Sequence, residues 1–194
     1  MKKITIEEII GIERYEQLRD EMRRRIIALK KHRRLAVGDR VTLVFENHDT
    51  MLFQTQEMVR AEHIVDLDRI RDEIAVYNEL IPDNNELSAT LLIEITQSDR
   101  IREELVKLIG IDESVTLEID GGLVVAAQFE PGRSKEDKLS AVQYVKFPFD
   151  TAAREAFLDR KRAARVVIEH PSYRHTAVIA GSLRESLVAD LADS

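Results

Sequence analysis

The amino-acid sequence predicts an α+β fold in which a long N-terminal amphipathic helix and further helices pack on a largely antiparallel mixed sheet. Two observations carry this prediction. Apolar residues recur at helical spacing in the first half of the chain, and short strands separated by turn residues dominate the second half. With 194 residues and 44% hydrophobic content, the chain can bury one core, so we expect a single domain over residues 1–194, helix-rich to about residue 110 and hairpin-rich over 111–194.

The first elements follow from capping and periodicity. Thr5 and Glu8 fit a capping box at the start of a short helix that Gly11 ends. Over residues 13–34 an apolar stripe predicts a long helix packed on a core; its members are Tyr15, Leu18, Met22, Ile26 and Leu29. A strand is expected over residues 40–46. Two more helices are expected, one from a Thr50 cap to about residue 63 and one over residues 66–77.

The rest of the chain reads mostly as strands joined by turns. Gly121-Gly122 is a strong signal for a two-residue hairpin, because both central positions of such a turn need a positive φ. Ser182 can cap a terminal helix that runs to about Leu191. The remaining expected helices cover residues 99–109 and 151–160. The remaining expected strands cover residues 88–95, 115–120, 123–129, 141–147, 165–169 and 176–180.

Composition excludes several chemistries. The chain has no cysteine, so disulfides, thiol nucleophiles and cysteine-ligated iron–sulfur clusters within this chain are excluded. No run approaches the 18 or so apolar residues of a membrane span, and no signal segment is recognisable, so we expect a cytoplasmic protein without membrane insertion. The chain also lacks a phosphate-binding glycine loop, a dinucleotide-binding motif and a serine nucleophile elbow, which argues against nucleotide-driven or serine-hydrolase chemistry.

The first candidate site is the polar stretch at 45–58, where a strand passes into a helix. Carboxylates and amides gather there, and they form a candidate ligand pocket that could bind a cation or transfer a proton. Its members are Glu46, Asn47, Asp49, Thr50, Gln54 and Glu57. The alternative is a hydrogen-bonded network that caps the helix and fixes the turn, because capping uses the same residue types.

The second candidate is the segment that carries His170 and His175. If its flanking strands pair across a four-residue loop, the two histidines lie directly opposite each other and could share a metal such as iron, manganese or zinc. A third ligand would have to come from elsewhere, for example Glu57, Glu62 or His63. The alternative is a turn packed by Pro171 and Tyr173.

The third candidate is a basic run at residues 22–34, which holds seven Lys and Arg residues and no acid although the net charge is −7. A helical projection gathers five of them away from the apolar stripe as a partner-contact surface: Arg23, Arg24, Lys30, Lys31 and Arg34. Nucleic-acid binding through this helix is an alternative. The aromatic content of 5% and the lack of a nucleic-acid motif weigh against it.

Several segments together make the chain resemble the bacterial family called domain of unknown function 3501. They are Arg-Arg-Arg-Ile-Ile-Ala-Leu-Lys at 23–30, Phe-Glu-Asn-x-Asp-Thr-Met at 45–51, Gln-x-Gln-Glu-Met at 54–58, Tyr77-Asn78, Ile81-Pro82, Ser-Ala-Val-Gln at 140–143, Phe-Pro-Phe at 147–149 and His-Pro-x-Tyr-x-His at 170–175. The resemblance spans nearly the whole chain. His48 stands where the family is expected to favour arginine, so His48 is not counted as a ligand.

The resemblance implies a supporting role in peroxide or anaerobic redox metabolism. Members of that family are typically encoded near rubrerythrin and an iron–sulfur oxidoreductase resembling heterodisulfide reductase, which become the expected partners. One hypothesis is therefore a non-catalytic accessory protein that docks on such a partner through the basic helix. The other is a metal-dependent enzyme or metal-binding protein that uses His170, His175 and carboxylates of the 46–57 segment. Either is compatible with a homo-oligomer.

Overall fold

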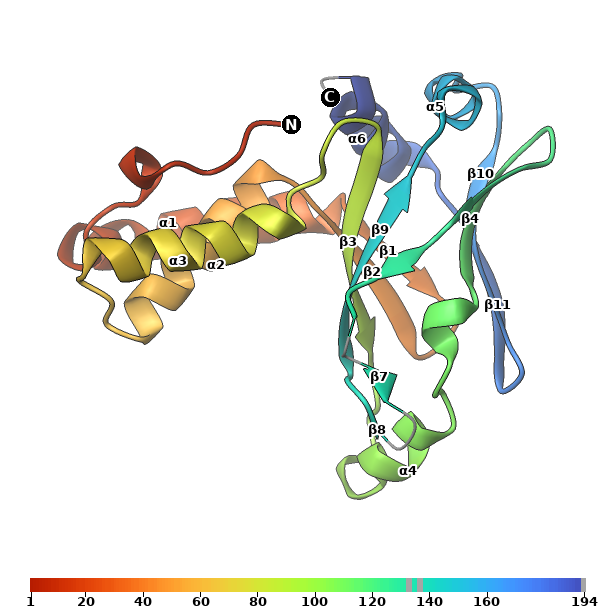
Figure 1. Cartoon of the computed structure of the whole chain (residues 1–194), viewed down its shortest axis with the longest axis horizontal. Coiled ribbons are helices and arrows are strands. Elements are labelled where there is room, and N and C mark those ends of the chain that lie inside the picture. The colour runs from red at the N-terminus through yellow and green to blue at the C-terminus, as the bar shows by residue number, and fades with distance from the viewer. Residues whose placement is uncertain (132–133, 136–137, 193–194) are drawn as a thin grey trace.

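The computed structural model describes residues 1–131, 134–135 and 138–192, and it confirms the predicted α+β class. Two sheets face each other, and an arm of three helices projects from the first of them (Figure 1). The first sheet consists of β1 (Arg34–Val37), β2 (Val41–Glu46), β3 (Glu86–Ile93), β9 (Val142–Pro148) and β6 (Gln128–Phe129), in this order. The second consists of β11 (Tyr173–Val178), β10 (Ala164–His170), β4 (Val115–Ile119) and β5 (Leu123–Ala126). Neighbouring strands within both sheets are antiparallel.

The arm and the ends of the two sheets carry the helices (Figure 1). The arm contains α1 (Ile12–Lys31), α2 (His48–Ala61) and α3 (Leu67–Leu80). At one end of the sheets lie α5 (Thr151–Leu158) and α6 (Gly181–Ala192), and at the other lies α4 (Ile101–Val106) with the small ribbon β7 (Ser134–Lys135) and β8 (Lys138–Leu139). Short 3₁₀ turns are η1 (Ile6–Glu8), η2 (Ser98–Arg100) and η3 (Ile111–Glu113). No helix in the described part of the chain has both the length and the apolar character needed to cross a bilayer.

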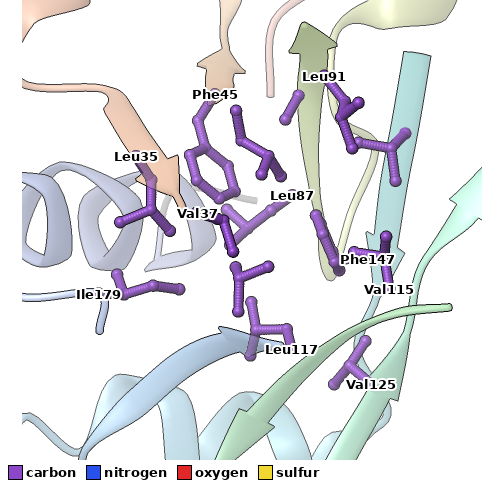
Figure 2. Close-up of a cluster of buried hydrophobic side chains, with 14 of the residues drawn as sticks. Leu35, Val37, Phe45, Leu87, Leu91, Val115, Leu117, Val125, Phe147 and Ile179 are labelled. Carbon is purple, nitrogen blue, oxygen red and sulfur yellow. The ribbon is translucent and has the colours of Figure 1, made fainter. Parts of the chain in front are cut away.

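The main core lies between the two sheets, as Figure 2 shows. Phe45, Leu87 and Phe147 of the first sheet point toward Leu117 and Val125 of the second, and all five are buried. A second cluster of buried side chains holds the arm together, with residues from the N-terminal segment, α2 and α3. The arm also covers the outer face of β2, so all six residues of that strand are buried. Both faces of β2 are therefore covered, and Leu43 and Phe45 of this strand belong to the main core.

Tyr173 ties the edge of the second sheet to the turn between β1 and β2. Its hydroxyl donates to the carbonyl oxygen of Val37 over 2.7 Å and accepts from the backbone N–H of Arg40 over 2.9 Å. Gly38 lies in that turn with φ +81°, and a Cβ built there would come within 2.5 Å of Tyr173 and His175. The turn therefore needs glycine both for its backbone angle and for the close approach of β11.

The predicted long helix is three residues shorter at its C-terminal end than expected. It ends at Lys31, and the chain passes through His32 and Arg33 into β1, a strand that sequence analysis missed. Basic residues favour a helix locally, but Leu35 and Val37 are buried in the main core, and this tertiary packing overrides the local preference. Arg34 consequently lies on a strand instead of the helix.

Other bounds also differ from expectation. The helix at 48–61 starts from an Asn47 cap, not from Thr50. The region expected to be one helix over 99–109 is divided between η2 and α4. The strand expected over 123–129 is interrupted at Ala127, so that β5 joins the second sheet and β6 the first. The Gly121-Gly122 hairpin is present with positive φ at both glycines, but Ile119 pairs with Leu123, which leaves a three-residue loop in place of the expected two.

Candidate functional site

A cavity of about 210 Å³ lies between the outer face of the first sheet and the helical arm. Its floor consists of alternate residues of β2, β3 and β9, which share one face because Val44 pairs with Thr90 and Thr90 with Tyr144. The floor residues are Val44, Glu46, Thr90, Leu92, Val142 and Tyr144. The arm supplies the walls, which are Lys30, Met51, Gln54, Tyr77 and Leu80.

Glu46 is the most unusual side chain in this cavity. It is only 3% exposed, and its Oε1 accepts a hydrogen bond from Thr90 Oγ1 over 2.7 Å. Its Oε2 is buried and has no hydrogen-bond partner among the described residues. The Nζ of Lys30 lies 3.9 Å from Oε2, close enough for an ion pair but beyond hydrogen-bond distance. A buried carboxylate oxygen without a donor costs free energy, so Glu46 is poised to accept a further donor.

Two uncharged polar residues face the same space. Burial raises the pKa of the Tyr77 hydroxyl, and a hydrogen bond with the Gln54 side chain partly offsets this effect. Both side chains line the cavity from the arm. Gln54 and Glu46 are therefore the two members of the predicted pocket that the fold brings to one cavity.

The other members of the predicted pocket have different surroundings. Asn47 and Thr50 form a reciprocal capping box at the start of α2, in which each backbone N–H donates to the other side chain over 2.9–3.0 Å. Asp49 is half exposed and forms an ion pair with Arg25 at 3.6 Å. These three residues fit the alternative of a helix-capping network.

Glu57 lies in an ion-pair cluster between α1 and α2. Arg19 donates to both carboxylate oxygens, and the Tyr15 hydroxyl donates to Oε1 over 2.7 Å. The guanidinium of Arg19 is the main reason that the pKa of Glu57 falls to about 2, and burial raises the pKa of Tyr15. The carboxylate is thus held by side chains of the arm and does not line the cavity.

The two predicted metal ligands on the β10–β11 hairpin are not directly opposite each other. The four-residue loop assumed from the sequence is wrong, because the strands continue to a two-residue turn of Pro171 and Ser172. His170 pairs with Tyr173 and His175 pairs with Ile168, so the histidines are offset along the hairpin. A hairpin register depends on its turn, and a shorter loop moves every pair.

Among the described residues, neither histidine has a metal-ligand set around it. His170 is buried, with Nε2 2.9 Å from the carbonyl oxygen of Ile109 and Nδ1 accepting from the backbone N–H of Ser172, so both ring nitrogens are engaged. His175 is exposed and packs on the ring of Tyr173. Within the described ranges, no three His, Asp or Glu side chains come together as a metal site. His48, set aside above, lies near Glu8 and Asp49 at 3.1 and 3.3 Å.

The predicted basic surface is smaller than expected. Arg23, Arg24 and Lys31 are exposed on α1. Lys30 instead lines the cavity beside Glu46, and Arg34 pairs with Glu94 from a strand. The helical projection misplaced Arg34 because the helix ends before that residue.

Thr90, Tyr77 and Tyr144 line the cavity but are not among the site residues predicted from the sequence. Their only local signal is that Thr90 and Tyr144 occupy alternate, outward positions of their strands. Their approach to Glu46 depends on strand order and on the placement of the arm. The helical projection places Lys30 on the predicted partner-contact surface, whereas the structure places it in the cavity wall.

Comparisons with known proteins agree with this architecture. The family described as "Protein of unknown function (DUF3501)" matches residues 3–191. A crystal structure described as a novel protein of unknown function from Burkholderia pseudomallei is similar, with 31% sequence identity and a TM-score of 0.90. The similarity covers 98% of this chain and 100% of that one. No curated protein matches the chain.

Proposed function

This chain belongs to the DUF3501 family, whose description assigns no activity, and we propose that it is a non-catalytic accessory protein that binds a small polar ligand beside Glu46. The observation that carries the proposal is the buried Glu46 Oε2, which faces a cavity and lacks a hydrogen-bond donor among the described residues. A ligand N–H group would supply that donor. Small-molecule sites typically have a few polar groups on a largely apolar lining. Here Val44, Leu92 and Val142 provide apolar lining around Glu46.

The cavity sets the size of the ligand. About 210 Å³ is below the 300–1,000 Å³ or so of sites for drug-sized molecules, so the ligand is a small metabolite. Thr90 holds one oxygen of Glu46 in place, which leaves the other to bind without reorienting the carboxylate. Pre-organisation of this sort lowers the entropic cost of binding.

A screen of small metabolites by thermal unfolding tests the ligand site. A compound bound at Glu46 should raise the melting temperature of the wild-type protein and not that of Glu46→Gln. Glu118→Gln is the matched control, because Glu118 is also a strand carboxylate but pairs with Arg165 on the second sheet. Stabilisation that persists unchanged in Glu46→Gln would refute this site.

We further propose that the exposed basic residues of α1 dock a partner in the cytoplasm. Arg23, Arg24 and Lys31 form a positive surface suited to an acidic partner. The partners implied by the family resemblance are rubrerythrin and the iron–sulfur oxidoreductase. Charge complementarity acts mainly on the rate of association, so binding through this surface should weaken as salt is added.

Partner capture tests the docking surface. Arg23→Glu/Arg24→Glu/Lys31→Glu should release rubrerythrin or the oxidoreductase from the immobilised protein. Arg102→Glu/Arg160→Glu/Lys161→Glu is the control, because these residues are also exposed and the change in net charge is equal. If the wild-type protein retains neither partner, or if both triple variants retain them equally, the docking proposal fails.

A further inference from the structure

The charges in the cavity narrow the class of ligand, and this inference rests on the proposed ligand site. Among the residues that line the cavity, Glu46 is the one acid and Lys30 the one base. A purely cationic ligand would satisfy Glu46 but lie against the ammonium of Lys30. A purely anionic ligand would have the opposite conflict with Glu46. A ligand that carries both charges meets neither conflict, because each charge faces its opposite.

The distance between the two groups limits how far apart the ligand charges can be. Glu46 Oε2 and Lys30 Nζ are 3.9 Å apart. Hydrogen bonds to charged groups are about 2.7–2.9 Å long, so ligand groups that contact both lie no more than roughly 9–10 Å apart. The ammonium and carboxylate of an α-amino acid share one carbon atom and satisfy this condition.

The remaining walls favour an apolar side chain. Val44, Leu92 and Val142 lie on the floor, while Met51 and Leu80 close the cavity from the arm. Burying an apolar group against them is favourable in proportion to the area removed from water. We infer that the cavity beside Glu46 and Lys30 binds a small zwitterion, an α-amino acid with an apolar side chain.

The first test uses leucine and its two half-charged analogues on the wild-type protein, measured by isothermal titration calorimetry. 3-Methylbutan-1-amine lacks the carboxylate, and 4-methylpentanoate lacks the ammonium. We expect each to bind about 10- to 100-fold more weakly than leucine, because each loses one charged hydrogen bond. 5-Aminopentanoate keeps both charges but has no branched apolar side chain to bury against Val44, Leu92 and Val142, so it should also bind more weakly. Equal binding of leucine and either half-charged analogue would overturn the inference.

The second test uses variants of the two charged residues. Glu46→Gln and Lys30→Met should each weaken leucine binding by a similar factor, and Glu118→Gln should leave it unchanged. Urea unfolding of the three variants shows whether they remain folded, and the analogue series on wild-type protein does not depend on that outcome. If leucine, valine and methionine all fail to bind wild-type protein, the inference is wrong.

The inference and the proposed function can fail separately. If 3-methylbutan-1-amine binds in a Glu46-dependent manner and leucine does not bind, the zwitterionic ligand is refuted but the proposed ligand site is supported. If no compound of the metabolite screen or of this series binds in a Glu46-dependent manner, both are refuted.

Discussion

Arg19 of α1 donates two hydrogen bonds to Glu57 of α2, from Nε to Oε1 over 2.8 Å and from the terminal nitrogen to Oε2 over 2.9 Å. This bidentate pair, with the Tyr15 hydroxyl as a third donor, joins the first two helices of the arm. Because Lys30 and Gln54 of the cavity wall belong to the same two helices, the pair helps to hold them in position. The carboxylate of Glu57 therefore has a structural role between the two helices.

Arg19→Ala should destabilise the protein by about 1–3 kcal/mol, because it leaves a partly buried carboxylate without its main donor. Urea unfolding measures the change in the free energy of unfolding. Arg23→Ala on the exposed face of the same helix is the control, and it should change stability by no more than about 0.5 kcal/mol. Equal effects of the two substitutions would show that the pair contributes nothing specific.

Glu57 should also make stability depend on pH. Its pKa in the folded protein is about 2, compared with an ordinary value of 4.5. Since the folded pKa is the lower one, this contribution is present above about pH 4.5 and is lost as the pH falls toward 2. It amounts to roughly 3 kcal/mol at most.

Unfolding by urea between pH 6 and about pH 2 tests this dependence. Glu57→Gln should reduce the slope of stability against pH without abolishing it, because the pKa values of Asp83 and Glu104 are also lowered by cations. A wild-type slope in the Glu57→Gln variant would contradict the assignment.

Arg33 should be the most sensitive basic residue of the chain segment between α1 and β2. It is 1% exposed, and it donates to the carbonyl oxygens of Phe45 and Glu46 and to the side chains of Ser186 and Asp190. Arg33→Met should lower the free energy of unfolding by about 3–5 kcal/mol, because it leaves Asp190 without the cation of a largely buried ion pair.

Arg34→Ala is the control for Arg33→Met, because Arg34 is the next residue in the chain but is exposed and pairs with Glu94 at the surface. It should cost less than about 1 kcal/mol. Thermal unfolding of both variants gives the comparison. A similar melting temperature for the two would show that the Arg33 network is not needed for stability.

Gly38→Ala should destabilise the protein more than Gly122→Ala. Both glycines have positive φ, +81° and +79°, so both substitutions carry the backbone cost of about 1–2 kcal/mol. Only at Gly38 would the new Cβ meet Tyr173 and His175 at about 2.5 Å. The difference in the free energy of unfolding between the variants therefore measures the close approach of β11 to the β1–β2 turn.

Elemental analysis of protein purified without oxygen tests the metal-binding alternative. His170→Ala/His175→Ala should leave the content of iron, manganese and zinc unchanged, because the ring nitrogens of His170 already contact Ile109 and Ser172. Stoichiometric metal that is lost in the double variant would instead establish the two histidines as ligands.

The sequence by itself determined the features that depend on neighbours along the chain. The apolar stripe of α1 and the glycine hairpin after β4 are local patterns, and both are present in the fold. The 45–58 segment was singled out from its polar residues at a strand-to-helix junction, and Glu46 and Gln54 of that segment line the cavity. Local sequence sufficed because side chains repeat with a fixed period along a helix or a strand, and because a tight turn needs particular residues.

Only the tertiary structure decided which of these side chains meet. The partners of Glu46 come from β3 and α1, and the partner of Glu57 lies 38 positions away in the chain. The same packing ended α1 at Lys31, moved β6 to the first sheet and set the register of the two histidines. Periodicity shows which face of an element is apolar, but it does not specify which other face will cover it, because that depends on the burial of the whole chain at once.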